Sequence, residues 1–482
     1  MLWEQMKRYV PLAVWSLAVL TLLLLPGRIL SYGFLPADDA LRHAAKAVCG
    51  KPWPEILVMR SDFAIDPHPG WHAVLGAVHR MFNCDAGSLV VFSVAGLMLL
   101  VTFSILPWLH RPEAWLAVLL AVTAFTPTFV SRLALGRPYL FSMAVFMTVL
   151  VIWSRLEERG PGALEMISTI LLLAAAAWIH GSFYLLVMPV AALLLAGRWR
   201  QALAFGACWA IGSVLGCALT GHPWQFLAQS VRHMFGVFGD YNISRQLVGE
   251  LLPSDGDFRT VLLVLGMLLW RSRAPNWKPT ELLNPLFLMG VLCWLLGLKV
   301  VRFWADWGLP AMLLWLVFEL QKQLESYLTF DSAKRLIITC GLALGVFLGA
   351  TSDRDGRWTR NLTNDYLTMD NPDLAGWLPG PGGIIYSADM RVFNDTFFKN
   401  PNAPWRYALG FESALMLPED RDVVRKIDWN FGDIRAYEPW VKKMRPNDRL
   451  IIRGERNIGS PNIPELEWHY GATELWIGRP RK

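Results

Sequence analysis

The fold is decided by residues 10–30, VPLAVWSLAVLTLLLLPGRIL, the first of several long apolar runs in the chain. As a helix, such a run is long enough to cross a hydrocarbon core about 30 Å thick. Lys7 and Arg8 precede it, as basic residues precede the apolar core of a signal peptide, but no small-x-small cleavage site follows. We therefore expect the run to remain as a membrane anchor.

Further apolar runs predict a polytopic α-helical membrane protein with about eleven transmembrane helices. The runs start near Val10, Ser88, Glu113, Tyr139, Ile167, Ser182, Ala202, Thr260, Leu282, Leu309 and Leu336. The fifth and sixth runs form one apolar stretch that is interrupted only at His180-Gly181, which we interpret as a hairpin.

The composition divides the chain into two parts. Of the 482 residues, 54% are apolar and 17% charged, whereas soluble domains average about 45–50% and about 25%. Residues 1–351 hold 26 Lys and Arg and 20 Asp and Glu, and residues 352–482 hold 19 of each. This argues against a soluble enzyme. It predicts a transmembrane domain over 1–351, with a long first outer loop over 31–87, and a soluble domain over 352–482.

The distribution of basic residues predicts the orientation, because cytoplasmic loops carry an excess of Lys and Arg. With the N-terminus inside, the inner segments hold Lys7, Arg8, Arg111, Arg155, Arg159, Arg198, Arg200, Arg271, Arg273, Lys278, Lys322, Lys334 and Arg335. The short outer loops hold only Arg132, Arg137, Lys299 and Arg302. An odd number of spans then places the C-terminal domain on the extracytoplasmic side. Because that domain is neutral, we expect no nucleic acid partner.

The C-terminal domain has the pattern of a small α/β domain. A turn and a strand are predicted over 382–387, a helix over 421–427, a strand over 449–453 and a final strand over 472–477. Trp405, Tyr407 and Trp440 could stack on sugar rings, and burial in the core is the alternative.

An acidic pair, Asp38-Asp39, follows directly where the first span leaves the membrane, before a short predicted helix over 40–48. Its structural explanation is a helix N-cap, which one Asp would satisfy. Later in the same loop, His68 lies between Pro67 and Pro69, before a helix predicted over 71–82. A lone histidine is more often structural than catalytic, but this one lies at the mouth of the bundle.

The four outer cations oppose the preferred orientation. Arg132 and Arg137 flank LALG, and Lys299 and Arg302 precede Phe303. Cations in such places are expected to bind an anionic group. The alternative is that these side chains extend to lipid headgroups, which requires no site.

Taken in order, the acidic pair, the turn His68-Pro69-Gly70 and the element Lys299–Arg302 with Phe303 and Pro310 resemble the GT-C superfamily of integral membrane glycosyltransferases. This superfamily includes protein O-mannosyltransferases, the aminoarabinose transferase of lipid A and oligosaccharyltransferases. The resemblance covers roughly residues 1–350. Gly70 departs from the family pattern, which has a second proline there.

The resemblance implies a transferase that moves a sugar from a polyprenyl phosphate to a glycan, lipid or protein acceptor on the outer face, at the inner membrane of a bacterium. Asp38 would match the catalytic base and Asp39 the second acidic position. Lys299 and Arg302 would lie near the donor phosphate, and we expect His68, Arg132 and Arg137 to contact substrate.

The same residue types suit this chemistry independently of any family. A carboxylate can take the proton of the acceptor hydroxyl, which contributes typically about 10²- to 10⁴-fold, and cations stabilise the phosphate that leaves. Two adjacent Asp repel each other unless one is paired. The sequence has no Gly-rich phosphate loop and no CxxC motif, so we assign no cofactor. A divalent cation stays open, because some GT-C members bind one. A Cys49–Cys84 disulfide also stays open.

Two other functions compete with the transferase. A transporter or flippase of lipid-linked sugars usually shows paired halves with polar residues near the midplane, and neither is visible here. A non-catalytic scaffold of envelope glycan assembly would leave Asp38, Asp39, Lys299 and Arg302 without a common role.

Overall fold

The computed structural model describes residues 9–37, 39–126, 128–156, 160–239, 249–274, 277–326, 332–362, 364–430, 432–472 and 474–481. Contacts divide the chain into two compact units. We call residues 1–34, 93–219 and 250–360 the membrane unit, and residues 35–92, 220–249 and 361–482 the mixed unit.

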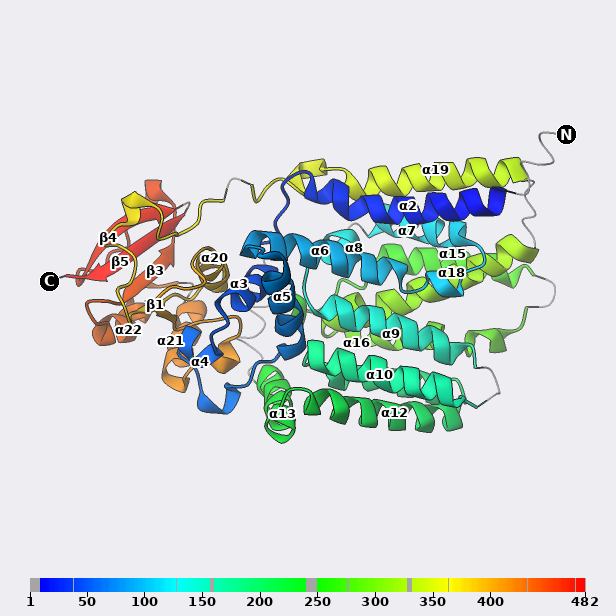
Figure 1. The fold of residues 1–482 in the computed structure, drawn as a ribbon, viewed down its shortest axis with the longest axis horizontal. Coiled ribbons are helices and arrows are strands. Elements are labelled where there is room, and N and C mark those ends of the chain that lie inside the picture. The colour runs from blue at the N-terminus through cyan, green and yellow to red at the C-terminus, as the bar shows by residue number, and fades with distance from the viewer. Residues whose placement is uncertain are drawn as a thin grey trace. The chain divides into compact units, whose positions relative to one another are not determined.

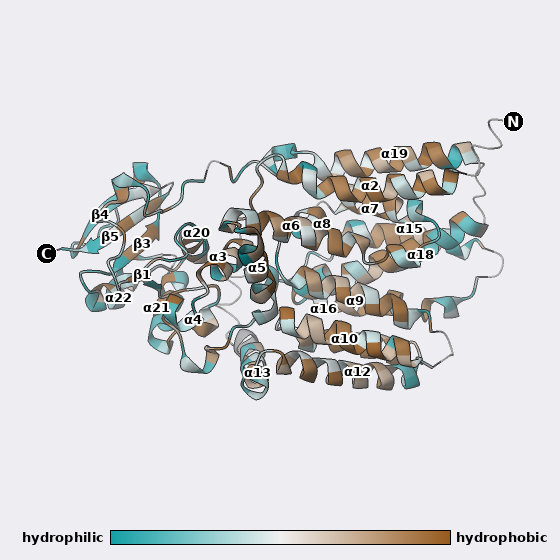
Figure 2. Cartoon of the chain, in the orientation of Figure 1, coloured by the Kyte–Doolittle hydropathy of each residue, from teal (hydrophilic) through white to brown (hydrophobic). Residues whose placement is uncertain are grey.

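Mostly apolar helices of 3 to 21 residues make up the membrane unit (Figure 1). They are α2 (Val10–Leu30), α7 (Pro112–Phe125), α8 (Thr128–Leu133), α9 (Tyr139–Ser154), α10 (Ala163–Ile179), α11 (Met188–Leu195), α12 (Trp199–Ala218), α15 (Phe258–Ser272), α16 (Pro285–Gly297), α17 (Val301–Phe303), α18 (Leu309–Ser326) and α19 (Ser332–Thr351). Helix α6 (Ala86–Phe103) is equally apolar. Figure 2 shows hydrophobic residues concentrated along these helices.

All eleven predicted apolar runs coincide with helices, but the number of membrane spans is a separate matter. Within the described residues, five helices are long and apolar enough to cross a membrane, and five further apolar helices have only 10–17 residues. At about 1.5 Å per residue the shorter ones fall below the thickness of a hydrocarbon core. Large apolar side chains are exposed on the outside of the unit, among them Leu12 (65%), Leu203 (65%) and Ile337 (69%). This surface is that of a membrane protein, and the eleven-span topology stays a prediction.

The break predicted between the fifth and sixth runs is confirmed. Helix α10 ends at Ile179, and a 3₁₀ turn over Phe183–Val187 leads into α11 after His180 and Gly181. The chain then returns in α12, which packs directly against α10.

Two glycines on α12 allow this close approach to α10. A Cβ atom at Gly216 would lie 2.4 Å from the carbonyl oxygen of Ala174, and one at Gly212 would lie 2.8 Å from that of Ile170. Small residues spaced four apart let helix backbones approach in this way, and packing of this kind stabilises helix pairs in membranes.

Replacing Gly216 with alanine is therefore expected to destabilise the protein by about 1–3 kcal/mol, because the added methyl group overlaps the α10 backbone. Gly206 on the same helix is the matched control, since its Cβ would meet only Val190 at 3.8 Å. Gly206→Ala should be neutral or slightly stabilising, because alanine is the better helix former. Thermal unfolding in detergent measures both variants, and equal melting temperatures would contradict the packing argument.

The mixed unit is built around a five-stranded sheet with the order β2-β1-β3-β5-β4. β1 pairs in parallel with β2 and β3, whereas β5 pairs antiparallel with β3 and β4. The strands are β1 (Ile384–Tyr386), β2 (Arg406–Tyr407), β3 (Arg449–Arg453), β4 (Leu466–Ala472) and β5 (Leu475–Pro480). The helices are α3 (Asp39–Cys49), α4 (Trp53–Ile56), α5 (Pro69–Phe82), α13 (Pro223–Gly239), α20 (Met390–Lys399), α21 (Pro418–Trp429) and α22 (Glu438–Lys443).

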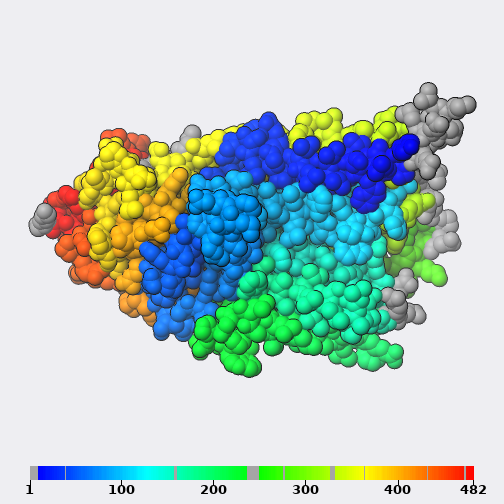
Figure 3. All heavy atoms as spheres, viewed as in Figure 1, coloured from blue at the N-terminus to red at the C-terminus, as the bar shows by residue number. Residues whose placement is uncertain are grey.

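The first loop and the C-terminal part share one hydrophobic core. Trp53, Ile56 and Leu57 are at most 3% exposed and pack in the same cluster as Phe397 and Tyr407. The backbone continues this association, because the amide of Val58 donates to the carbonyl of Tyr407 at 2.9 Å, beside strand β2. In the space-filling view, atoms of the first loop (blue) lie against those of the C-terminal part (yellow and orange) (Figure 3). The loop predicted over 31–87 therefore folds largely with the domain predicted over 352–482.

The predicted secondary structure of the C-terminal part is confirmed except at its end. β1, α21 and β3 lie where strand, helix and strand were expected, and β3 has the predicted bounds. The final strand predicted over 472–477 is confirmed in part: β5 begins at Leu475, but residue 472 ends β4, because Glu474 has a left-handed φ of 59° and marks a turn between the two strands. Trp405, Tyr407 and Trp440 are at most 3% exposed, so burial explains them. Cys49 and Cys84 are free thiols.

Candidate functional site

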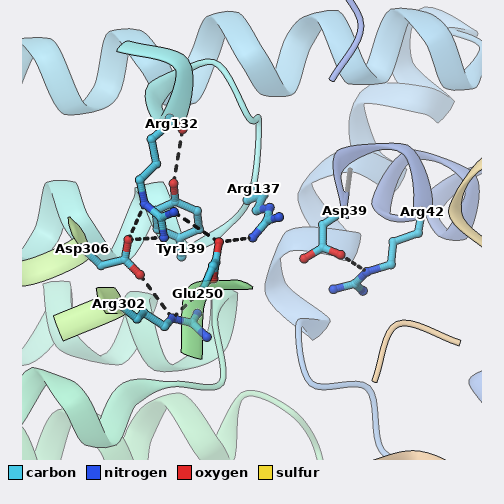
Figure 4. A network of polar contacts seen from close by, with 8 residues as sticks. All are labelled: Asp39, Arg42, Arg132, Arg137, Tyr139, Glu250, Arg302 and Asp306. Carbon is cyan, nitrogen blue, oxygen red and sulfur yellow. Dashed lines mark hydrogen bonds and ion pairs between the residues drawn. The ribbon is translucent and has the colours of Figure 1, made fainter. Parts of the chain in front are cut away.

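The second residue of the acidic pair, Asp39, lies at the start of α3 in the mixed unit. Asp38 lies outside the described residues. Asp39 begins the helix, where the helix dipole favours a carboxylate. Its Oδ1 accepts a hydrogen bond from Nε of Arg42 at 2.9 Å, and the Arg42 side chain is only 4% exposed (Figure 4). Two adjacent carboxylates repel each other unless one is paired, and Arg42 is the partner of Asp39.

Arg42 is buried among groups that suit a cation. Its guanidinium carbon lies 4.1 Å from the centre of the Phe411 ring, a cation–π arrangement. Within the described part of the chain, Nη1 of Arg42 is buried and has no hydrogen-bond partner. Glu412, next to Phe411, pairs with His233 of α13. Burial opposes ionisation of Glu412, but the attraction of His233 and of Arg42 holds its pKa below the usual range.

Three hydrogen-bonded side chains run from α5 to α3. Oδ2 of Asp66 lies 2.5 Å from Nδ1 of His72, and Nε2 of His72 lies 2.8 Å from Nδ1 of His43. His43 is fully buried and His72 is 8% exposed. The other carboxylate oxygen of Asp66 accepts from the indole of Trp53 at 3.2 Å and from the amide of His68 at 3.0 Å.

His68, predicted as a substrate contact, is brought into the same cluster. It precedes Pro69, the first residue of α5, a position that proline favours because its missing N–H is not needed there. Its ring centre lies 4.9 Å from that of His43. Three histidine rings are thus gathered around the start of α5. Of these three histidines only His68 was predicted from the sequence, although His72 follows Gly70 by two residues and His43 follows Asp39 by one helical turn.

The stability of the mixed unit is expected to fall in acid. Burial opposes ionisation of Asp66, but the attraction and hydrogen bond of His72 hold its pKa well below the usual range. A carboxyl group with a lowered pKa contributes stability that is complete above about pH 4 and is lost as the pH falls towards its folded value. Melting temperatures measured between pH 5 and pH 3 should therefore fall less steeply in Asp66→Asn than in the wild type. The exposed Asp370→Asn is the control and should keep the wild-type slope. Equal slopes in Asp66→Asn and wild type would remove this explanation.

Three of the predicted cations form a compact cluster in the membrane unit (Figure 4). Arg132 of α8 donates from Nε to Oδ1 of Asp306 at 2.7 Å, and its Nη1 lies 3.2 Å from Glu250. Arg137 donates to the same oxygen of Glu250 at 2.6 Å, and Arg302 donates from Nε to Oδ2 of Asp306 at 3.2 Å. These five groups carry three positive and two negative charges.

Asp306 is held by an unusual backbone turn. Residues Trp304–Gly308 form a π-helical turn between α17 and α18, and the Asp306 side chain is 3% exposed. Gly308 makes the turn compact, because a Cβ there would lie 2.6 Å from the Trp304 ring. Single π turns occur frequently at functional sites. They persist only where the surrounding contacts stabilise them, and here the two arginines do so.

Three of the four predicted cations, Arg132, Arg137 and Arg302, thus bind carboxylates of the chain itself. Asp306 could have been identified from the sequence, because it follows Arg302 by four residues, the spacing of a helical ion pair. Glu250 has no such signal. Lys299 lies between α16 and α17 and is exposed. Among the described residues, no group of three or more His, Cys, Asp or Glu side chains is arranged to hold a metal ion.

Comparisons with known proteins find similarity among solved structures. No model of a protein family matches the chain, and no curated protein matches it. Among solved structures, the chain is similar to the single-particle cryo-EM structure of arabinofuranosyltransferase AftD from Mycobacteria, with 14% sequence identity and a TM-score of 0.45. The match covers 99% of this chain and 40% of that chain, so the protein spans about two fifths of the length of the transferase.

Proposed function

We propose that the protein is a membrane glycosyltransferase of the GT-C type, which transfers a sugar from a polyprenyl-phosphate donor to a glycan, lipid or protein acceptor. The observation that carries the proposal is the largely buried array at the start of α3, where the buried Arg42, His43 and His72 pair with or lie beside the half-buried Asp39 and Asp66. Burying so many ionisable groups is costly unless they are paired, and such clusters mark functional sites. In the sequence, the array follows the first apolar helix, which ends at Leu30.

The proposed reaction is a displacement at the anomeric carbon. The oxygen of an acceptor hydroxyl forms the new glycosidic bond, and the bond between the anomeric carbon and the phosphate oxygen breaks. The phosphate leaves with the electron pair, and the hydroxyl proton passes to a carboxylate. Asp38 is the proposed base, because Asp39 is already the partner of Arg42. His68 is proposed to contact substrate beside this array.

The cationic cluster of the membrane unit is proposed to bind the phosphate. Arg132, Arg137 and Arg302 outnumber Glu250 and Asp306 by one charge, and each guanidinium carries five N–H donors. The leaving phosphate gains negative charge, which preorganised guanidinium groups stabilise. Lys299, which is exposed between α16 and α17, is proposed to help bind the lipid-linked phosphate. The divalent cation that some GT-C members bind stays open for this chain, and the proposed reaction is written without a metal step.

The proposed location is the inner membrane of a bacterium, with the N-terminus in the cytoplasm. The C-terminal domain then lies on the extracytoplasmic side. Lipid-linked donors suit this side, because nucleotide-sugars are cytoplasmic.

The test is a transfer assay with the purified full-length protein in proteoliposomes. Polyprenyl-phosphate sugars are supplied as donors, with extracts of envelope glycans and glycolipids as acceptors, and mass spectrometry follows the products. Release of polyprenyl phosphate with a glycosylated product supports the proposal. Translocation of the intact donor without transfer would indicate a transporter, and neither activity would indicate a scaffold.

A further inference from the structure

The C-terminal sheet has a topological switch point between β1 and β3. From β1 the chain crosses through α20 to β2 on one side, and from β2 it crosses through α21 and α22 to β3 on the other. The two crossovers cover opposite faces, because β1 contributes Ile385 to a cluster with α20, and Ile384 to a different cluster with α21 and α22. In open α/β sheets, ligands bind outside the carboxyl ends of the strands at this point.

A cavity lies at this position. Its volume is about 270 Å³, close to the lower limit of about 300 Å³ for small-molecule pockets. Three lining residues follow β1 and three end β3, and the others come from α21 and the segment after it. The lining consists of Ser387, Ala388, Asp389, Ile427, Asp428, Gly432, Tyr437, Ile451, Ile452 and Arg453. We call this space the switch-point cavity.

Asp428 is placed where folding alone would not favour a carboxylate. It lies in the last turn of α21, where the helix dipole opposes negative charge. Its Oδ2 is buried and has no hydrogen-bond partner within the described residues. Burial raises the pKa of Asp428. A buried polar atom without a hydrogen-bond partner lowers the stability of the fold. Such an atom in the wall of a cavity is expected where a ligand supplies the missing hydrogen bond.

The remaining polar groups of the cavity define what it can bind. Asp389 caps α20 and accepts from Arg453 at 2.7 Å, so the cation and the helix N-terminus are already satisfied by a carboxylate. Burial and the carboxylates of Asp428 and Asp389 raise the pKa of Tyr437 to about 12, so its hydroxyl keeps its proton. With two carboxylates and one paired arginine, the cavity disfavours a phosphate or carboxylate ligand. Neutral hydroxyl groups fit, because carboxylates accept their hydrogens and Tyr437 can donate.

We propose that the switch-point cavity binds one neutral sugar residue through hydrogen bonds from its hydroxyl groups to Asp428 and Asp389. That the cavity serves as a subsite for the acceptor rests on the proposed glycosyltransferase function. The bound residue would hold the acceptor glycan on the mixed unit during transfer.

The direct test is saturation-transfer NMR on the full-length protein in detergent. The probes are the methyl glycosides of glucose, galactose, mannose, arabinose and N-acetylglucosamine. At least one glycoside should give a saturable signal with the wild type, and the signal should weaken at least tenfold in Asp428→Asn. The matched control is Asp422→Asn, which changes an exposed carboxylate on the same helix that pairs with exposed Arg425, and it should bind as the wild type does.

A second readout separates lost binding from lost folding. Because Oδ2 of Asp428 is buried without a hydrogen-bond partner among the described residues, and the group lies at a helix C-terminus, Asp428→Asn should melt at a higher temperature than the wild type while losing the sugar. In the transfer assay, this variant should raise the KM for acceptor at least tenfold with little change in kcat.

Two outcomes would overturn the inference. One is that no glycoside gives a saturable signal, and the other is that the signal is equal in Asp428→Asn and Asp422→Asn. Transfer activity without this binding would leave the proposed function standing and remove the subsite. Binding that depends on Asp428 in a protein without transfer activity would keep the sugar site and remove the proposed function.

Discussion

Asp38→Asn is expected to lower the kcat of sugar transfer by about 10²- to 10⁴-fold, the usual contribution of a general base. The KM values should change little, because asparagine keeps the shape of the side chain and removes only its ability to take a proton. The melting temperature should stay at that of the wild type. The measurement is single-turnover transfer in proteoliposomes, with thermal unfolding of the same preparation.

Asp39→Asn is the matched variant at the next position, and it should behave differently. Asp39 is the ion-pair partner of Arg42, whose side chain is 4% exposed. Removing the carboxylate leaves this buried cation with a weaker partner, at a cost of about 1.5–3 kcal/mol. Adding Arg42→Met to Asp39→Asn should recover part of that loss, because the cation that needed a partner is then gone.

The two adjacent acids are thus expected to have different roles: Asp38 affects the rate of transfer, and Asp39 affects the stability of the fold. If Asp38→Asn kept full activity while Asp39→Asn lost it without melting earlier, the two roles would be exchanged. Loss of stability in both variants would instead assign the pair to the fold alone, as the helix-cap explanation has it.

Local patterns in the sequence predict local structure well here. Apolar runs coincide with helices because a helix satisfies its backbone polar groups within one segment, so each run specifies its own structure. Strand β3 over Arg449–Arg453 is likewise an apolar run after a turn. β2, only two residues long, has no such pattern and exists because its neighbours pair with it.

The association of distant segments could not be predicted in this way. Trp53 and Leu57 pack with Tyr407, about 350 residues later, because the apolar side chains of both segments are stabilised by burial. No local pattern in either segment indicates which distant segment it packs against. For the same reason, only some of the residues in the candidate site could be predicted from the sequence. The misplaced cations Arg132 and Arg302 were evident against the orientation rule, whereas their partner Glu250 is set by tertiary contacts.

Asp306→Asn is expected to destabilise the membrane unit by about 3–5 kcal/mol, the usual cost of breaking a buried ion pair. Asp306 is 3% exposed and accepts hydrogen bonds from both Arg132 and Arg302. Without its charge, Glu250 alone faces three guanidinium groups. The exposed Asp255→Asn is the control in the same unit and should melt as the wild type does. Thermal unfolding in detergent, with the fluorescence of the 24 tryptophans as the signal, gives both values.

The effect of added phosphate on stability then distinguishes a phosphate-binding site from an ion-pair cluster that only stabilises the fold. The excess charge of the cluster rises from one in the wild type to two in Asp306→Asn. A site that binds the donor phosphate should therefore be stabilised by inorganic phosphate more strongly in the variant, since a ligand stabilises the folded state that it binds. Chloride at equal ionic strength controls for screening. If phosphate and chloride act equally in both proteins, the arginines hold α8 to the π turn and bind no donor, and the phosphate site must lie elsewhere.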